Sequence, residues 1–150
     1  MIHLPPEFKE FLQLLNARGV EFLVVGGYAV GFHGYPRATG DMDVWVAFRP
    51  GNLRQVAAVL KDFGFTINEP VEDFLREGQF IGIGASPLRI EILTAISGVD
   101  FAECFAQRVE TLVDGIAVPF ISLHQLKANK QASARLKDLN DLENLPDTTS

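Results

Sequence analysis

The stretch Phe22–Val46, FLVVGGYAVGFHGYPRATGDMDVWV, decides the fold because a glycine corner and a pair of acids lie between two apolar runs. The first run, Val20–Val25, is short and β-branched and stops at Gly26-Gly27, which predicts a buried strand ending at a turn. Residues Tyr28 to His33 predict one or two helical turns. The two glycines either bring backbone N–H groups close to a phosphate or supply the φ freedom of a tight turn.

Two acids open the second run. Asp41 and Asp43 lead into an apolar strand, and a period of two places both carboxylates on one face and Val44 and Val46 on the other. Adjacent carboxylates repel each other and require a cation, a basic side chain or water. A divalent metal meets this need, because hard cations bind carboxylate oxygens and keep positions open for phosphate. The pair therefore predicts a metal site, although Asp-x-Asp is also common in surface turns.

A third acid lies in the run Leu88–Leu93, LRIEIL, where alternation separates Glu91 from Ile90 and Ile92. If this strand pairs beside that of the aspartates with its isoleucines in the same core, Glu91 joins their face. Three carboxylates can hold two Mg²⁺ ions, about 3.5–4 Å apart, for phosphoryl transfer. The alternative is that Glu91 pairs with Arg89 on a solvated strand face.

These motifs carry a family resemblance. The chain resembles the minimal nucleotidyltransferases of the DNA polymerase β superfamily, and most of all the AbiEii and MenT type of bacterial nucleotidyltransferase toxins and their relatives. The resemblance spans about Val20 to Leu93 and, more loosely, Ser122 to Leu145. It rests on Gly26-Gly27, a spacer with His33-Gly34 and Arg37-Ala-Thr39, and Asp41-x-Asp43 before an apolar strand.

The resemblance implies an α/β fold (α+β in some schemes), with a mixed β-sheet and helices mainly on one face. Two positions depart from the family pattern. Tyr28 follows the glycines where many members have a small or hydroxyl residue, and Glu91 stands where the third carboxylate is usually aspartate.

The activity that the resemblance implies is Mg²⁺-dependent transfer of a nucleoside monophosphate from a nucleoside triphosphate, such as ATP, to an acceptor hydroxyl. Two Mg²⁺ ions are expected, with Asp41, Asp43 and Glu91 as catalytic residues and metal ligands. The implied nucleotide-binding residues are Gly26, Gly27, Arg37, Lys127 and Lys130. The alternatives are that Arg37 only pairs with acids and that each lysine lies on an ordinary solvated helical face.

A helix carries both lysines. Ser122 to Gln125 reads as a capping box that opens the helix, and the small residues Ala132 to Ala134 predict a break. The following stretch, Lys137-Asp138-Leu139-Asn140-Asp141, matches an Arg/Lys-Asp-x-x-Asp motif of the family.

Length and composition bound the remaining possibilities. A chain of 150 residues with 47% hydrophobic content predicts a single domain over 1–145, followed by a disordered tail at 146–150. The formal charge of -6 argues against broad, charge-driven binding of nucleic acid. Cys104 is the only cysteine and is expected to be buried. Because there is no signal-like or membrane-length run, we expect a cytoplasmic protein without membrane contact.

The acceptor stays open on sequence alone. An RNA 3′ end is expected if the protein is a toxin-like enzyme, and a cognate antitoxin protein would then be its partner. The alternatives are a small antibiotic-like molecule, a protein hydroxyl, or a degenerate module that binds a nucleotide or partner without catalysis. The missing serine after the glycines favours the degenerate module, whereas the three retained acids argue against it.

Overall fold

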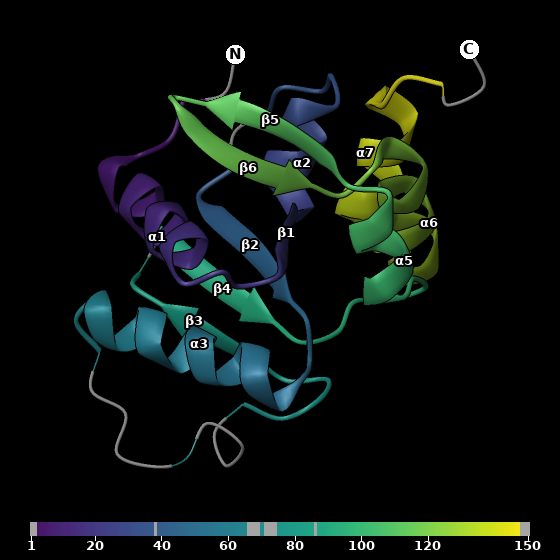
Figure 1. Cartoon of the computed structure of the whole chain (residues 1–150). Coiled ribbons are helices and arrows are strands. Elements are labelled where there is room, and N and C mark those ends of the chain that lie inside the picture. The colour runs from purple at the N-terminus through teal and green to yellow at the C-terminus, as the bar shows by residue number, and fades with distance from the viewer. Residues whose placement is uncertain (1–2, 38, 66–69, 71–74, 86, 148–150) are drawn as a thin grey trace.

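The structure is a computed structural model that describes residues 3–37, 39–65, 70, 75–85 and 87–147. Within these residues, six strands form one sheet in the order β3-β4-β2-β1-β6-β5 (Figure 1). The strands are β1 (Phe22–Val25), β2 (Asp41–Val46), β3 (Phe80–Ile83), β4 (Arg89–Leu93), β5 (Val109–Val113) and β6 (Ile116–Phe120). The helices are α1 (Pro6–Ala17), α2 (Gly26–Phe32), α3 (Pro50–Asp62), α5 (Phe101–Ala106), α6 (Leu123–Ser133) and α7 (Leu136–Asn144).

The sheet is mixed, as the sequence predicts. Strand β2 runs antiparallel to β1 and parallel to β4, and β1 runs parallel to β6. The two outer strands, β3 and β5, are antiparallel to their neighbours. The pairing of β2 with β4 places Asp43 opposite Glu91 and Val44 opposite Ile92. The β4 strand therefore pairs as the prediction for Glu91 required. The isoleucines and valines lie on one face of the sheet, and the three acids lie on the other.

Two expected boundaries differ from the observed ones. Helix α2 begins at Gly26 itself and not after the glycines, since Val25 already serves as its extended N-cap. Strand β2 begins at Asp41, so both aspartates lie within the strand. Both shifts move the glycines and the acids closer together, because Val25 is paired with Asp43 across β1 and β2.

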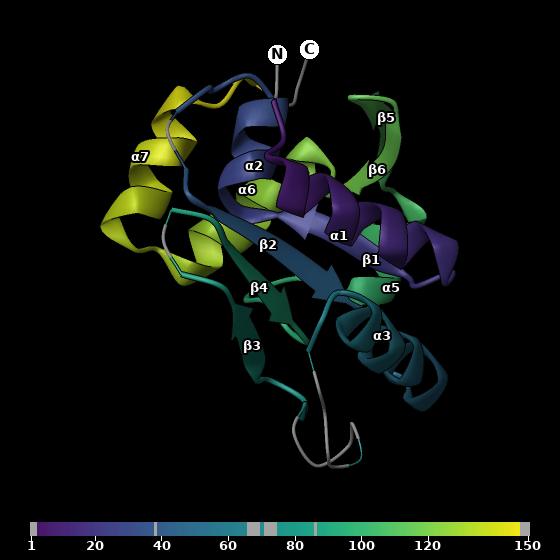
Figure 2. The same cartoon turned by 90° about the vertical axis from the view of Figure 1, so that its left-hand side faces the viewer.

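Helices lie on both faces of the sheet. The family resemblance implied helices mainly on one face. Leu12 of α1 lines one small apolar space with Val24 and Met42, and α3 packs beside α1. The opposite face carries Trp45, whose ring meets Phe101 of α5 edge-on at 5.0 Å between centroids. Because helix α5 covers this face, the side chain of Trp45 is only 2% exposed. Figure 2 shows α1 and α3 on one side of the strands and α7 on the other.

Local signals in the C-terminal half are confirmed. The Asp-Gly pair at 114–115, between two apolar runs, predicts a hairpin turn, and the β5–β6 hairpin does turn at Asp114-Gly115, which both have positive φ. The Ser122 hydroxyl accepts a hydrogen bond from the Gln125 backbone N–H and so caps α6. Ala134, at φ 50°, is the left-handed C-cap that ends α6 before α7 begins.

The predictions for Cys104, for three short segments and for membrane-spanning helices can be compared with the structure. Cys104 is fully buried, and burial, followed by the charges of Asp100 and Glu103, raises the pKa of its thiol to about 11. The sequence also predicts a short strand at 65–67 and a hairpin turn at 85–87. Residues 66–67, the centre of that turn at 86 and the end of the tail at 148–150 fall outside the described residues. None of the helices in the described ranges combines the length and apolarity needed to cross a membrane.

Candidate active site

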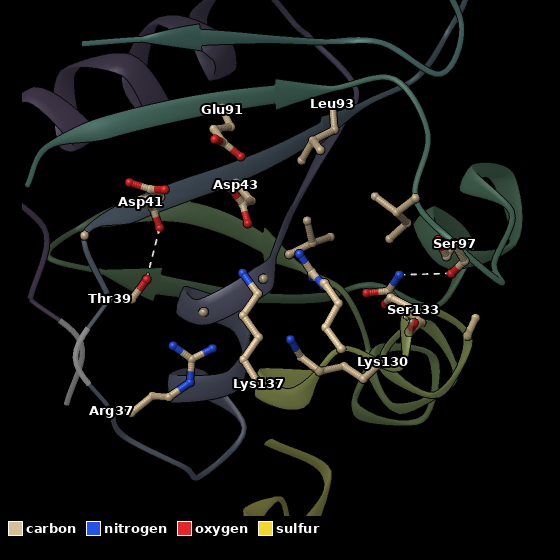
Figure 3. Close-up of a pocket in the computed structure, with 18 of the residues that line it drawn as sticks. Arg37, Thr39, Asp41, Asp43, Glu91, Leu93, Ser97, Lys130, Ser133 and Lys137 are labelled. Carbon is tan, nitrogen blue, oxygen red and sulfur yellow. Dashed lines mark hydrogen bonds between the residues drawn. The ribbon is translucent and has the colours of Figure 1, made fainter. Parts of the chain in front are cut away.

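A cleft of about 1040 Å³ lies between the acid-bearing strands and the helices α6 and α7 (Figure 3). All three predicted acids line it, as do both predicted glycines. Of the predicted basic residues, Arg37 and Lys130 line the cleft, and Lys127 is not among the described residues that do so. The structure therefore brings together seven of the eight predicted site residues.

Asp43 is the most perturbed acid of this cleft. Burial raises the pKa of its carboxyl to about 7, helped by the charge and hydrogen bonding of Glu91 and by the charge of Asp41, whereas the charge of Lys137 lowers it. Within the described part of the chain, the buried Asp43 Oδ1 has no hydrogen-bond partner. A buried carboxylate oxygen beside other acids is stabilised by a cation.

The chemistry of these donors fits Mg²⁺, which binds hard carboxylate oxygens. Asp43 and Glu91 stand side by side in register, with Asp41 on the same strand. In the residues that the structure describes, no three acid, histidine or cysteine side chains converge as a metal site. Figure 3 shows the Asp41 carboxylate apart from those of Asp43 and Glu91. Glu91 also accepts a hydrogen bond from Arg89 Nε at 3.2 Å, so the alternative predicted for Glu91 holds as well.

The two glycines are required by close approach to β2 and to the loop before it. Gly26 has φ +66°, and a Cβ atom there would overlap the Asp43 carboxylate. A Cβ atom at Gly27 would lie 2.6 Å from Thr39 Oγ1. The structure thus supports a conformational role for both residues, and contact with a phosphate stays a prediction.

The basic side chains opposite the acids differ in their surroundings. Lys130 is 3% exposed and pairs with Asp138 at 3.2 Å and Asp141 at 3.0 Å. Arg37 pairs with Asp141 through Nε at 2.7 Å and Nη2 at 2.9 Å. The acid that Arg37 is shown to bind is therefore on α7, and not Asp41 or Asp43.

Lys137 also belongs to the cleft, although it is not among the site residues predicted from the sequence. It lines the cleft, and Figure 3 shows its side chain extending toward Asp43. The signal was present in the Lys137-Asp138-x-x-Asp141 motif. In the structure, both aspartates of this motif are buried and the lysine beside them faces the cleft.

Comparison with known proteins supports the fold. No family model and no curated protein sequence matches the chain. Several solved structures are similar to it, and the three described below, at 14–16% identity, show the fold alone. The chain therefore has the nucleotidyltransferase fold, which confirms the fold expected from the resemblance; the closer relation to AbiEii and MenT toxins stays a prediction.

The first of these structures is a Thermotoga maritima protein assigned as a nucleotidyltransferase, with a TM-score of 0.61, 15% identity, and coverage of 94% of this chain and 91% of that chain. The antibiotic-resistance factor ANT(2'')-Ia has a TM-score of 0.62 and 14% identity, covering 91% and 79% of the two chains. The lincosamide antibiotic adenylyltransferase LnuA, bound to lincomycin, has a TM-score of 0.56 and 16% identity, covering 94% and 95%.

Replacing Gly26 by alanine should cost more than the same change at Gly19. Both glycines have almost the same φ, +66° and +65°, but nothing lies within 4 Å of a Cβ atom at Gly19. Gly19→Ala should lose only the left-handed backbone cost of about 1–2 kcal/mol. Gly26→Ala must also displace Asp43, which adds roughly 1–3 kcal/mol. Equal losses in urea unfolding would show that Asp43 moves aside freely.

The stability of the metal-free protein should fall between pH 4 and pH 8 because of Asp43. Its pKa lies at about 7 in the folded chain, against an ordinary value of 3.8. Stability from the protonated carboxyl is complete below pH 4 and is lost as the pH rises through about 7. Asp43→Asn removes this ionisation, so its unfolding free energy should decline less over the same range.

Thermal and urea unfolding in EDTA at several pH values would check this expectation. Asp62→Asn is the matched control, because the hydrogen bond from Arg18 lowers the pKa of the exposed Asp62 carboxyl. Its contribution changes only below the ordinary pKa, so this variant should run parallel to the wild type between pH 5 and pH 8. Parallel curves for Asp43→Asn as well would contradict the assigned pKa.

Proposed function

We propose that the protein transfers a nucleoside monophosphate from a nucleoside triphosphate to an acceptor hydroxyl, with Mg²⁺ as cofactor. The observation that carries the proposal is the environment of Asp43. Its buried Oδ1 has no hydrogen-bond partner in the described residues, and the residue stands opposite Glu91 in a cleft with basic side chains on the other wall. The fold shared with an antibiotic adenylyltransferase supports the same reaction class.

Asp41, Asp43 and Glu91 are the residues that would hold Mg²⁺ in this cleft. When bound, Mg²⁺ supplies charge neutralisation of the triphosphate and lowers the pKa of a coordinated hydroxyl. In the reaction, the acceptor oxygen bonds to the α-phosphorus and the bond to the β-phosphate oxygen breaks. Glu91 accepts the hydroxyl proton, and Lys137 and Arg37 stabilise the charge on the leaving pyrophosphate.

We propose an RNA 3′ end as the first acceptor, on the resemblance to the toxin enzymes; an antitoxin protein would then be the partner. The cleft favours a second candidate, a small hydroxylated molecule. The far side of the cleft lies between α6 and the end of β4 with the segment that follows it. Among the described residues, the neutral ones that line this side include Leu93, Ile96, Ser97, Asn129 and Ala132. An RNA strand brings phosphates that need cations, whereas a small uncharged acceptor does not.

Label transfer from each of the four α-labelled nucleoside triphosphates, with Mg²⁺, would test the function. One set of reactions contains total bacterial RNA, and a second contains a panel of small polyhydroxylated compounds. The wild type should label one acceptor class. Asp43→Asn should lose at least about 100-fold of the rate, since Asp43 would hold the Mg²⁺ that neutralises the charge of the reacting phosphate.

Lys61→Ala provides the control, because Lys61 lies in the last turn of α3, away from the cleft-lining residues. Labelled RNA would support the toxin-like role, and a labelled small compound would support the second candidate. Undiminished transfer by Asp43→Asn would overturn the metal-site assignment. Failure to bind any triphosphate would favour a degenerate module.

A further inference from the structure

Helix α7 is inverted relative to an ordinary surface helix. Its buried residues are Asp138 and Asp141, which are 0% and 1% exposed, whereas Leu136 and Leu139 are 86% and 46% exposed. A surface helix normally turns its apolar stripe inward and its charges outward. The inward face of α7 is therefore held by ion pairs.

These ion pairs form one connected cluster from three parts of the chain. Asp138 binds Lys130 Nζ at 3.2 Å and Arg135 Nε at 2.7 Å. Asp141 binds the same Lys130 Nζ at 3.0 Å and Arg37 through two bonds of 2.7 and 2.9 Å. The cluster joins the loop before β2 to α6 and to α7.

Stability alone does not explain such a cluster. Burying charges carries a large desolvation penalty, and well-packed apolar residues in their place are often at least as stable. The same helix has leucines, and two of them, Leu136 and Leu139, lie on the surface. A paired, planar guanidinium does supply fixed orientation, because its two bonds to one carboxylate define the plane of the group.

The orientation matters because of where Arg37 lies. Its Nη1 is 3.4 Å from the position that a Cβ atom would occupy at Gly27, and Arg37 and Gly27 line the same cleft. Asp141 holds the other side of the guanidinium. Burial raises the pKa of Asp141, but the hydrogen bonds from Arg37 and Lys130 outweigh it and leave the pKa below its ordinary value. Asp141 is therefore a charged partner at neutral pH.

We propose that Asp141 is a positioning residue for triphosphate binding that acts through Arg37, which it orients at the Gly27 corner. Lys130, buried between Asp138 and Asp141, is the counter-ion of this cluster and does not contact the triphosphate. The inference rests on the proposed function, since it assumes that the Gly27 side of the cleft receives the phosphates.

A double-mutant cycle on phosphate affinity tests this role. The probe is inorganic tripolyphosphate with Mg²⁺, measured by titration calorimetry, so that neither the base nor the acceptor needs to be known. Arg37→Ala and Asp141→Asn should each weaken binding by about 10-fold, the usual value of a hydrogen bond to a charged group. In the Arg37→Ala background, Asp141→Asn should add at most about a 2-fold loss, because its effect passes through the removed side chain.

Two further variants keep the test decisive. Arg37→Lys retains the charge but cannot form the two-bond pair, so it should also weaken binding, and it provides a readout if Asp141→Asn fails to fold. Arg18→Ala with Asp62→Asn is the matched control, since this surface pair, at 2.8 Å, lies away from the cleft-lining residues and should leave affinity unchanged. Equal losses from Asp141→Asn in both backgrounds would overturn the proposal.

The outcomes also separate this inference from the proposed function. Coupled losses of tripolyphosphate affinity without nucleotidyl transfer to any acceptor would support the positioning role and overturn the enzyme. Nucleotidyl transfer with an unchanged KM for the triphosphate in Asp141→Asn would overturn the positioning role and leave the enzyme. A raised KM with a nearly unchanged kcat is the expected result.

Discussion

The parallel pairing of β2 with β4 is the constraint on which the rest of the site depends. It places Asp43 and Glu91 at the same level of the sheet, where two carboxylates repel each other. Burial, reinforced by that repulsion, raises the pKa of Asp43. The residues around Asp43 fit its position. Gly26 leaves room for the Asp43 carboxylate because it has no Cβ atom, and Lys137 faces that carboxylate across the cleft (Figure 3).

Much of the fold was accessible from local sequence. Alternation placed the acids and the apolar residues on opposite faces, and the Asp114-Gly115 turn and the Ser122 cap were each encoded within a few residues. The sequence did not determine the register of β2 against β4, on which the position of Glu91 depends, since pairing between distant strands depends on the whole core. The second helical face was missed because Trp45 looked like one more residue of an apolar strand, and only the structure shows Phe101 covering it.

The basic side of the site was harder to predict for a different reason. Arg37 and Asp141 are 104 positions apart, so no local pattern connects them. Helical spacing grouped Lys127 with Lys130, yet Lys130 turns inward to two aspartates and Lys127 is not among the described cleft-lining residues. Lys137 lines the cleft from α7, which follows the left-handed residue Ala134 at the end of α6.

The inverted arrangement of α7 also separates this helix from the hydrophobic core in energetic terms. The fully buried residues of the helix are two aspartates, and its apolar anchor, Leu145 at 7% exposed, follows only after the helix ends. The helix itself is therefore attached chiefly through buried ion pairs, which dissolved salt screens much less than it screens surface pairs. The wall of the cleft that carries Lys137 thus keeps its position through directional charge pairing, whereas the strands that carry the acids are fixed by their apolar core.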